Sequence, residues 1–142
     1  MPILREPNVA LKEKLDFLEQ EVAFNTRLKE LHFIDSNGHC VFLDGSSYSV
    51  LDRDWFRAAV SGKRYISSPY ISRATGELIA TFAVPIYDAN RTVVGVLSAD
   101  ISGHLLSNDI ADIVIGKTGN CYILDSKGVM IANKDPKLVE NQ

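Results

Sequence analysis

The chain begins with a helical pattern of apolar positions. Four of them recur at spacings of four, three and four residues, with Lys and Glu between them: Leu11, Leu15, Leu18 and Val22. This spacing places them on one stripe of a helix, and Asn8 is a residue type that often caps a helix N-terminus. We therefore predict an N-terminal helix over residues 8–30, which either covers its own core or pairs with its copy in a homodimer. Residues 1–7 hold two prolines and no pattern, so they are expected to form a frayed leader.

Two later segments have the pattern of antiparallel hairpins. Residues 31–43 contain two short apolar runs around Asn37 and Gly38, and Asn-Gly supplies the positive φ angles of a tight hairpin turn. Residues 77–101 contain two longer runs rich in β-branched side chains, separated by the turn residues 88–91. Each segment is expected to form two paired strands.

Shorter helices are expected after each hairpin. One is predicted over residues 53–61, with Asp52 as its cap and Gly62 as its end. The other is predicted over residues 102–114, capped by Ser102. Helices combined with antiparallel hairpins indicate an α+β fold with a central antiparallel sheet.

An internal similarity links the two ends of the chain. Residues 33–41 align without gaps to residues 123–131, and both stretches have an Asp-Ser-x-Gly turn between apolar runs. We infer a first module over residues 31–116 and the start of a second, truncated module at residues 117–142. Because a lone hairpin is only marginally stable, the last segment is expected to be mobile or to pair with another chain.

Composition and charge exclude several classes of function. At 142 residues with 46% hydrophobic and 23% charged positions, the chain can bury a core without help from disulfides. A net charge of −3 gives no basic face for nucleic acid. No run has the length of a membrane span and no signal peptide is evident, so any membrane attachment is expected through segments outside this sequence. Cys40 and Cys121 form neither a disulfide framework nor a redox motif.

Candidate catalytic residues do not form a recognisable arrangement. His32, His39 and His104 lack the spacing of metal ligands, and no Ser-His-Asp or Cys-His pattern is present. Residues 116–119 are too short and wrongly ordered for a phosphate-binding loop. We therefore expect no enzymatic activity, no metal and no cofactor.

The stretch from Tyr48 to Asp100 has the chemistry to hold a small zwitterion. Arg53 can donate two parallel N–H bonds to a carboxylate, and the Trp55 indole can donate a third. Asp100 can accept the ammonium group, and Tyr48 and Tyr70 can flank it with hydroxyls or rings. Together these groups match both ends of an α-amino acid.

Each of these residues also has an ordinary structural interpretation. Arg53 could be a solvated residue in the first turn of a helix, and Trp55 and Phe56 could be core anchors. Tyr48 and Tyr70 could be strand or loop aromatics, while Asp100 could cap the helix that follows. Only the combination and order of these residues favour a binding site.

Several motifs resemble the Cache sensor domains, which are PAS-like modules in the extracytoplasmic part of bacterial chemoreceptors, sensor kinases and cyclic-nucleotide enzymes. The most specific are Arg53-Asp54-Trp55-Phe56-Arg57-Ala58-Ala59, Ser68-Pro69-Tyr70, Val84-Pro85-Ile86-Tyr87-Asp88 and Gly95-Val96-Leu97-Ser98-Ala99-Asp100-Ile101. Residues 119–128 look like the opening of the membrane-proximal module of tandem (double) Cache proteins. The resemblance implies a PAS-like sheet with a long N-terminal helix and flanking helices, and makes residues 31–116 the membrane-distal, ligand-binding module.

The resemblance also implies a ligand and a set of contacts. Family members that bind amino acids share a Tyr, an Arg-x-Trp-Tyr motif, a further Tyr and a distant Asp, which correspond to Tyr48, Arg53, Trp55, Phe56, Tyr70 and Asp100. Phe56 stands where a tyrosine is expected and lacks its hydroxyl. An extracytoplasmic amino-acid sensor is therefore expected. The alternatives are a Cache module for a small carboxylate or a protein partner, and a cytosolic PAS or GAF-like dimerisation module.

Overall fold

A computed structural model describes residues 2–42 and 44–140, which lie in two compact units. The first unit comprises residues 1–67 and 81–100, and the second comprises residues 68–80 and 101–142. The helices are α1 (Pro2–Arg5), α2 (Leu11–Phe24), α3 (Asp54–Val60), α4 (Leu105–Ile110) and α5 (Lys137–Glu140). The strands are β1 (Leu28–Asp35), β2 (His39–Val41), β3 (Ser47–Ser49), β4 (Tyr65–Ile66), β5 (Tyr70–Ile71), β6 (Leu78–Tyr87), β7 (Val93–Ser102), β8 (Tyr122–Leu124) and β9 (Met130–Asn133).

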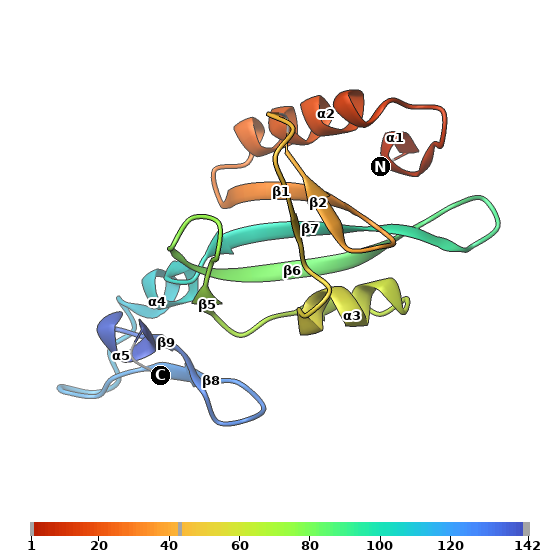
Figure 1. The fold of residues 1–142 in the computed structure, drawn as a ribbon. Helices are drawn as coiled ribbons and strands as arrows, with labels where there is room; N and C mark the ends of the chain where they lie inside the picture. The colour runs from red at the N-terminus through yellow and green to blue at the C-terminus, as the bar shows by residue number, and fades with distance from the viewer. Residues whose placement is uncertain (1, 43, 141–142) are drawn as a thin grey trace. The chain divides into compact units, whose positions relative to one another are not determined.

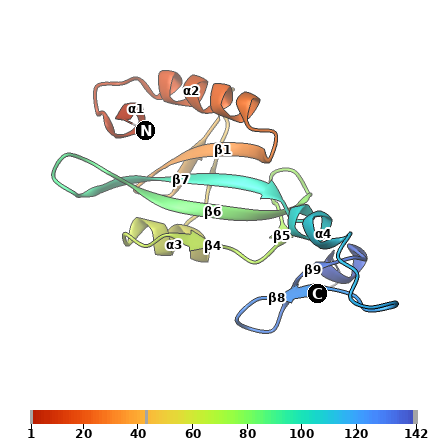
Figure 2. The same cartoon turned by 180° about the vertical axis from the view of Figure 1, so that it is seen from behind.

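The main sheet has the strand order β3-β2-β1-β7-β6-β4, and β5 also pairs with β6. The pairs β1–β2, β2–β3, β4–β6 and β5–β6 are antiparallel. In the first unit, α2 lies along one face of the central strands and α3 along the opposite face (Figure 1 and Figure 2). The predicted α+β class with a central antiparallel sheet and flanking helices is confirmed.

The core on the α2 face includes the N-terminal segment. Leu4 of α1 is only 1% exposed and packs with Leu18 of α2 and Ile86 of β6. The frayed leader expected for residues 1–7 is therefore wrong for Pro2–Arg5, because burial of one leucine side chain contributes about 1.5–3 kcal/mol. Leu15 is also buried within this unit, so α2 covers its own core. A homodimer through this helix stays a prediction.

The N-terminal helix is shorter than the predicted span of residues 8–30. It begins after Ala10, without a side-chain cap, so Asn8 does not start it. It ends before Asn25, whose side-chain oxygen accepts the N–H of Arg27 and whose carbonyl accepts the N–H of Leu28. This local turn competes with the helix and sends the chain directly into β1. No helix in residues 2–42 and 44–140 has both the length and the apolar character to cross a membrane.

The two shorter helices also begin later than predicted. Arg53, not Asp52, is the N-cap of α3, and it forms no side-chain capping bond. The predicted end is confirmed, since Gly62 has a φ of +90° and donates its N–H to the Ala59 carbonyl. Ser102 is not a helix cap, because it still belongs to β7.

Two hairpin turns repeat the same hydrogen bonds, as the sequence similarity suggested. The carboxylate of Asp35 accepts the N–H groups two and four residues later, both at 2.9 Å. Asp125 does the same at 2.8 and 2.9 Å. Gly38 and Gly128 have φ angles of +79° and +81°, whereas Asn37 does not adopt a positive φ. The expected Asn-Gly turn is thus replaced by a turn that an aspartate closes and a single glycine completes.

The turn between β6 and β7 is built the same way with an arginine in place of glycine. Asp88 accepts the N–H groups of Asn90 and Thr92, both at 2.8 Å. Arg91 has a φ of +63° and is the one non-glycine residue with positive φ among the residues described. A side chain in this region costs about 1–2 kcal/mol, so the turn forms despite its sequence.

The hairpin of β8 and β9 does not stand alone in the second unit. Ala132 on β9 is fully buried, and Ile110 on α4 and Val139 on α5 are nearly so. β9 contacts both helices. The expectation that residues 117–142 are mobile or need another chain is therefore wrong for the part described, because α4 and α5 supply the missing apolar face. The start of a second module at residue 117 stays a prediction.

Candidate functional site

One face of the main sheet carries buried polar side chains in its three central strands. Leu31 and Phe33 of β1 pack in the core beside α2, so His32 between them points to the opposite face. On that face, side chains from β1, β6 and β7 combine polar chemistry with low exposure: His32 (6%), Thr81 (0%), Ser98 (1%) and Asp100 (7%). Buried polar groups of this density are unusual outside functional sites.

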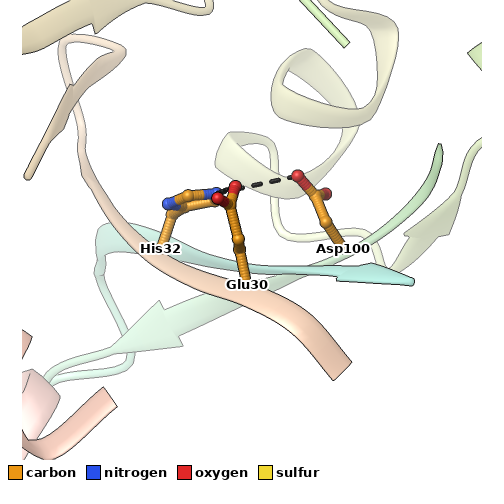
Figure 3. Close-up of side chains that lie close together, drawn as sticks. All are labelled: Glu30, His32 and Asp100. Atoms are coloured by element: carbon orange, nitrogen blue, oxygen red, sulfur yellow. Dashed lines mark ion pairs between the residues drawn. The ribbon is translucent and has the colours of Figure 1, made fainter. Parts of the chain in front are cut away.

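Asp100 is held from two sides. The Thr81 hydroxyl donates to one carboxylate oxygen at 2.6 Å, and the other oxygen lies 3.6 Å from His32 Nε2. His32 Nε2 also lies 3.2 Å from an oxygen of Glu30. Figure 3 shows the side chains of Glu30, His32 and Asp100 close together. Neither carboxylate is aligned for a hydrogen bond with Nε2. The imidazole thus lies between two carboxylates that approach the same nitrogen.

The charges of this cluster favour the binding of a cationic group. Burial lowers the pKa of His32, but contacts with Asp100, Cys40 and Glu30 outweigh burial and raise the pKa to about 11. The contact with His32 also lowers the pKa of Glu30, more than burial raises it. One imidazolium and two carboxylates leave a net negative charge, which attracts a cationic group.

A row of rings connects Tyr48 to this cluster. Tyr48 of β3 stacks on Phe42 with ring centres 5.6 Å apart and planes at 29°. Phe42 then meets His32 edge to face at 5.4 Å. Among the predicted site residues, Tyr48 and Asp100 are therefore linked through Phe42 and His32.

The residues predicted on α3 have different surroundings. Trp55 is 6% exposed and meets Phe56 edge to face, with ring centres 6.5 Å apart. Phe56 is 2% exposed and lies under the β1–β2 turn, where a Cβ atom on Gly38 would be 3.3 Å from its ring. Arg53 is half-buried immediately before α3. Phe56 is therefore a core ring that supports Trp55.

Unpaired polar atoms gather in the first unit. Among the described residues, its buried side-chain atoms without a hydrogen-bond partner are His32 Nε2, Trp55 Nε1 and Ser98 Oγ. Leaving a buried polar group unsatisfied costs about 1–3 kcal/mol. Such atoms are expected where a ligand supplies the missing partner.

Tyr70 belongs to the second unit. It is half-buried on β5 and pairs with Ile79 at the start of β6. Its role as a site residue, like that of Arg53, stays a prediction.

A hollow of about 400 Å³ reaches the cluster from the end of α2 and the start of β1. Its lining includes Glu19, Val22, Glu30, Leu31, His32 and Phe42. This hollow connects Glu30 and His32 to solvent.

The sequence did not lead us to expect that Glu30, His32, Thr81 and Ser98 lie in the polar cluster around Asp100. A local signal existed for the first two, because Glu30 and His32 are two residues apart on a strand and share a face. Their approach to Asp100 depends on the pairing of β1 with β7, which no local pattern specifies. For the same reason the spacing of the histidines along the sequence did not disclose this cluster.

Comparison with known proteins is consistent across sequence and structure. Residues 4–142 match the family model of the Cache domain. The methyl-accepting chemotaxis protein PscA of Pseudomonas syringae pv. tomato is 30% identical over 95 residues, which are 66% of this chain and 15% of that protein. Sporulation kinase D of Bacillus subtilis is 31% identical over 104 residues, 70% of this chain and 21% of the kinase. The chain therefore spans a small part of the curated relatives that it matches.

Solved structures share the fold at low identity. The ligand-binding domain of the Pseudomonas fluorescens chemoreceptor CtaA, in complex with L-serine, has a TM-score of 0.76 and 21% identity, covering 99% of this chain and 63% of that one. The sensory domain of the Campylobacter jejuni chemoreceptor Tlp3, with isoleucine bound, has a TM-score of 0.72 and 19% identity, covering 97% and 57%. Because the family model spans residues 4–142 and the fold is that of chemoreceptor ligand-binding domains, the chain belongs to the Cache family of sensor domains.

Proposed function

We propose that this domain is the extracytoplasmic, ligand-binding part of a bacterial transmembrane receptor, and that its ligand is an amino acid or a related small zwitterion. The family and the receptor relatives support the first statement. The amino acids in the similar CtaA and Tlp3 structures support the second. The domain binds its ligand without chemical change.

The observation that carries the proposal is the buried carboxylate of Asp100. Thr81 fixes one of its oxygens at 2.6 Å, and Ser98 on the same strand face has a buried hydroxyl without a partner among the described residues. A ligand ammonium group accepted by Asp100 would gain a charge-assisted bond of about 1.5–3 kcal/mol. The negative charge of the surrounding cluster favours the same end of the ligand.

The ligand carboxylate is assigned to the start of α3. The Trp55 indole N–H is buried and without a partner in the described chain, so it can donate. Arg53 adds a guanidinium that can donate two parallel bonds. Tyr48 flanks the ligand and Phe56 contributes packing, while a role for Tyr70 stays a prediction. Desolvation of both charged ends offsets much of this gain, so we expect micromolar affinity, about −8 kcal/mol.

A thermal-shift screen of the twenty amino acids and a panel of small carboxylates tests the proposal. An amino acid at about 100 times its Kd should stabilise the wild type by roughly 2.7 kcal/mol. Arg53→Ala and Asp100→Asn should abolish the shift, whereas Asp109→Asn, a change at an exposed carboxylate, should retain it.

Other outcomes identify the alternatives. If a carboxylate without an amino group stabilises the protein equally and Asp100→Asn has no effect, the pocket binds anions and the zwitterion assignment is wrong. If no compound shifts the melting temperature, a protein partner or a dimerisation role replaces small-molecule sensing. Signalling further requires that the ligand prefer one of two receptor arrangements, because equal affinity for both shifts nothing.

A further inference from the structure

The side chains of Glu30, His32 and Asp100 have the composition of a metal site, and two of their three ligand-atom separations match binding to one ion. One nitrogen and two carboxylate oxygens from these residues all lie within 4.8 Å of one another. Two ligand atoms bound tetrahedrally to one zinc ion, each at about 2.0–2.1 Å, are about 3.3–3.4 Å apart. His32 Nε2 lies 3.2 Å from the Glu30 oxygen and 3.6 Å from the Asp100 oxygen, on either side of that value. We propose that these three residues bind a divalent transition-metal cation, with Zn²⁺ as the best match.

The missing hydrogen-bond partner of buried His32 Nε2 supports cation binding more directly than the distances do. His32 is 6% exposed, and its Nε2 lies close to both carboxylates (Figure 3) but makes no hydrogen bond to either. A metal ion located between the three atoms would take the nitrogen lone pair and both carboxylate oxygens at once. A proton on Nε2 can be shared with only one acceptor at a time in good geometry. A proton and a metal ion are thus alternative occupants of this position.

The residues around the three ligands resemble the outer shell of a metal site. The Thr81 hydroxyl donates to one oxygen of Asp100 and leaves the other oxygen facing His32. Hydrogen bonds of this kind orient metal ligands and raise affinity by about 10–100-fold. The ring of Phe42 packs edge to face with the imidazole and so helps to fix its orientation. Three protein ligands leave at least one coordination position open, which is typical of zinc sites that accept a further ligand.

The cation also has a path to the site. The hollow of about 400 Å³ beside α2 is lined by both Glu30 and His32, and the Glu30 side chain is 40% exposed. Glu19 adds a further carboxylate to that lining. An ion can therefore reach Nε2 through this opening, whose lining carries Glu19 and Glu30 but also Lys29, without passing the residues assigned to the amino-acid carboxylate.

This inference does not rest on the proposed amino-acid function, although the two share Asp100. Metal binding needs Glu30 and His32, whereas the amino-acid proposal needs Arg53 and Trp55. The Arg53→Ala variant should therefore lose amino-acid binding and keep metal binding. Since Zn²⁺ would occupy one oxygen of Asp100, we expect bound Zn²⁺ to weaken the binding of an amino-acid ligand.

The experiment is a calorimetric titration of the metal-free chain with Zn²⁺, paired with Co²⁺ as a spectroscopic probe. The wild type should bind one Zn²⁺ with a Kd below about 10 μM, and Co²⁺ should give the visible absorption of a tetrahedral site. His32→Gln and Glu30→Gln should each weaken Zn²⁺ binding by about 100-fold or more, and Thr81→Val by about 10-fold or more. His39→Gln removes an exposed imidazole and is the matched control, which should bind as the wild type does.

Glu30 is partly exposed, so Glu30→Gln should fold and tests the site even if His32→Gln does not. Retention of Zn²⁺ affinity within threefold in Glu30→Gln and in a folded His32→Gln would place the ion elsewhere and overturn the proposal. Failure of the wild type to bind Zn²⁺ below about 100 μM would overturn it as well. Neither result tests amino-acid binding, which the thermal-shift screen measures separately.

Discussion

Raising the pH should remove a stabilisation that protonated His32 gives to the folded chain. In the unfolded chain an imidazole has a pKa of about 6.5. In the folded chain burial lowers the pKa, but Asp100, Cys40 and Glu30 outweigh burial and raise it to about 11. Because the folded state holds the proton more tightly, the stabilisation is complete below pH 6.5 and is lost as the pH rises toward 11. Between pH 6.5 and 9 the loss approaches 1.4 kcal/mol per pH unit, or about 3 kcal/mol.

Urea unfolding of the wild type and of His32→Gln in the presence of a chelator measures this loss. Trp55 is the one tryptophan in the sequence, and its burial makes its fluorescence a direct probe of unfolding. Subtracting the variant from the wild type at each pH cancels the titration of groups that do not contact His32. The excess stability of the wild type should fall by about 3 kcal/mol from pH 6.5 to 9. A difference that stays constant within about 0.5 kcal/mol would refute the reasoning, and His39→Gln shows whether loss of an exposed imidazole matters.

Three further substitutions test features of the fold by the same unfolding assay. Thr81→Val keeps the side-chain volume but removes the bond to Asp100, so it should destabilise the chain by about 1.5–3 kcal/mol; exposed Thr92→Val is the control, and equal effects would contradict the assignment. Arg91→Gly should stabilise the chain by roughly 0.5–1 kcal/mol, since glycine tolerates a φ of +63°, and a loss of stability would argue against that backbone conformation. Gly38→Ala should destabilise it by about 1–2 kcal/mol, because its φ is +79°; a neutral effect would contradict this.

The sheet could be predicted from the sequence because its hairpins depend on local chemistry. Asp35 and Asp88 each close a turn with bonds to backbone groups within four residues, so the signal lies in one short stretch. The ends of the helices were harder to predict from the sequence. Asn25 can be a helix residue or a turn residue, and Leu4 looked unstructured because the core that buries it comes from α2 and β6.

Only part of the candidate site could likewise be predicted from the sequence. The order of Tyr48, Arg53, Trp55 and Asp100 carried a family pattern that could be recognised without coordinates. The partners of Asp100 could not be recognised in this way, since a strand pairing between distant segments brings His32 to it. Sequence order is therefore the basis of the proposed ligand class, whereas only the fold showed the polar cluster around Asp100.

The three turns closed by aspartate also bear on the order in which the molecule assembles. Each turn joins strands that are neighbours along the chain, so these hairpins close small loops and can form within microseconds. The pairing of β1 with β7 closes a much longer loop and has to wait for the hairpins. Glu30 and His32 lie on one side of that late pairing and Asp100 on the other. The cluster is thus completed only as the sheet itself is completed, so a chain that stalls during folding would lack it.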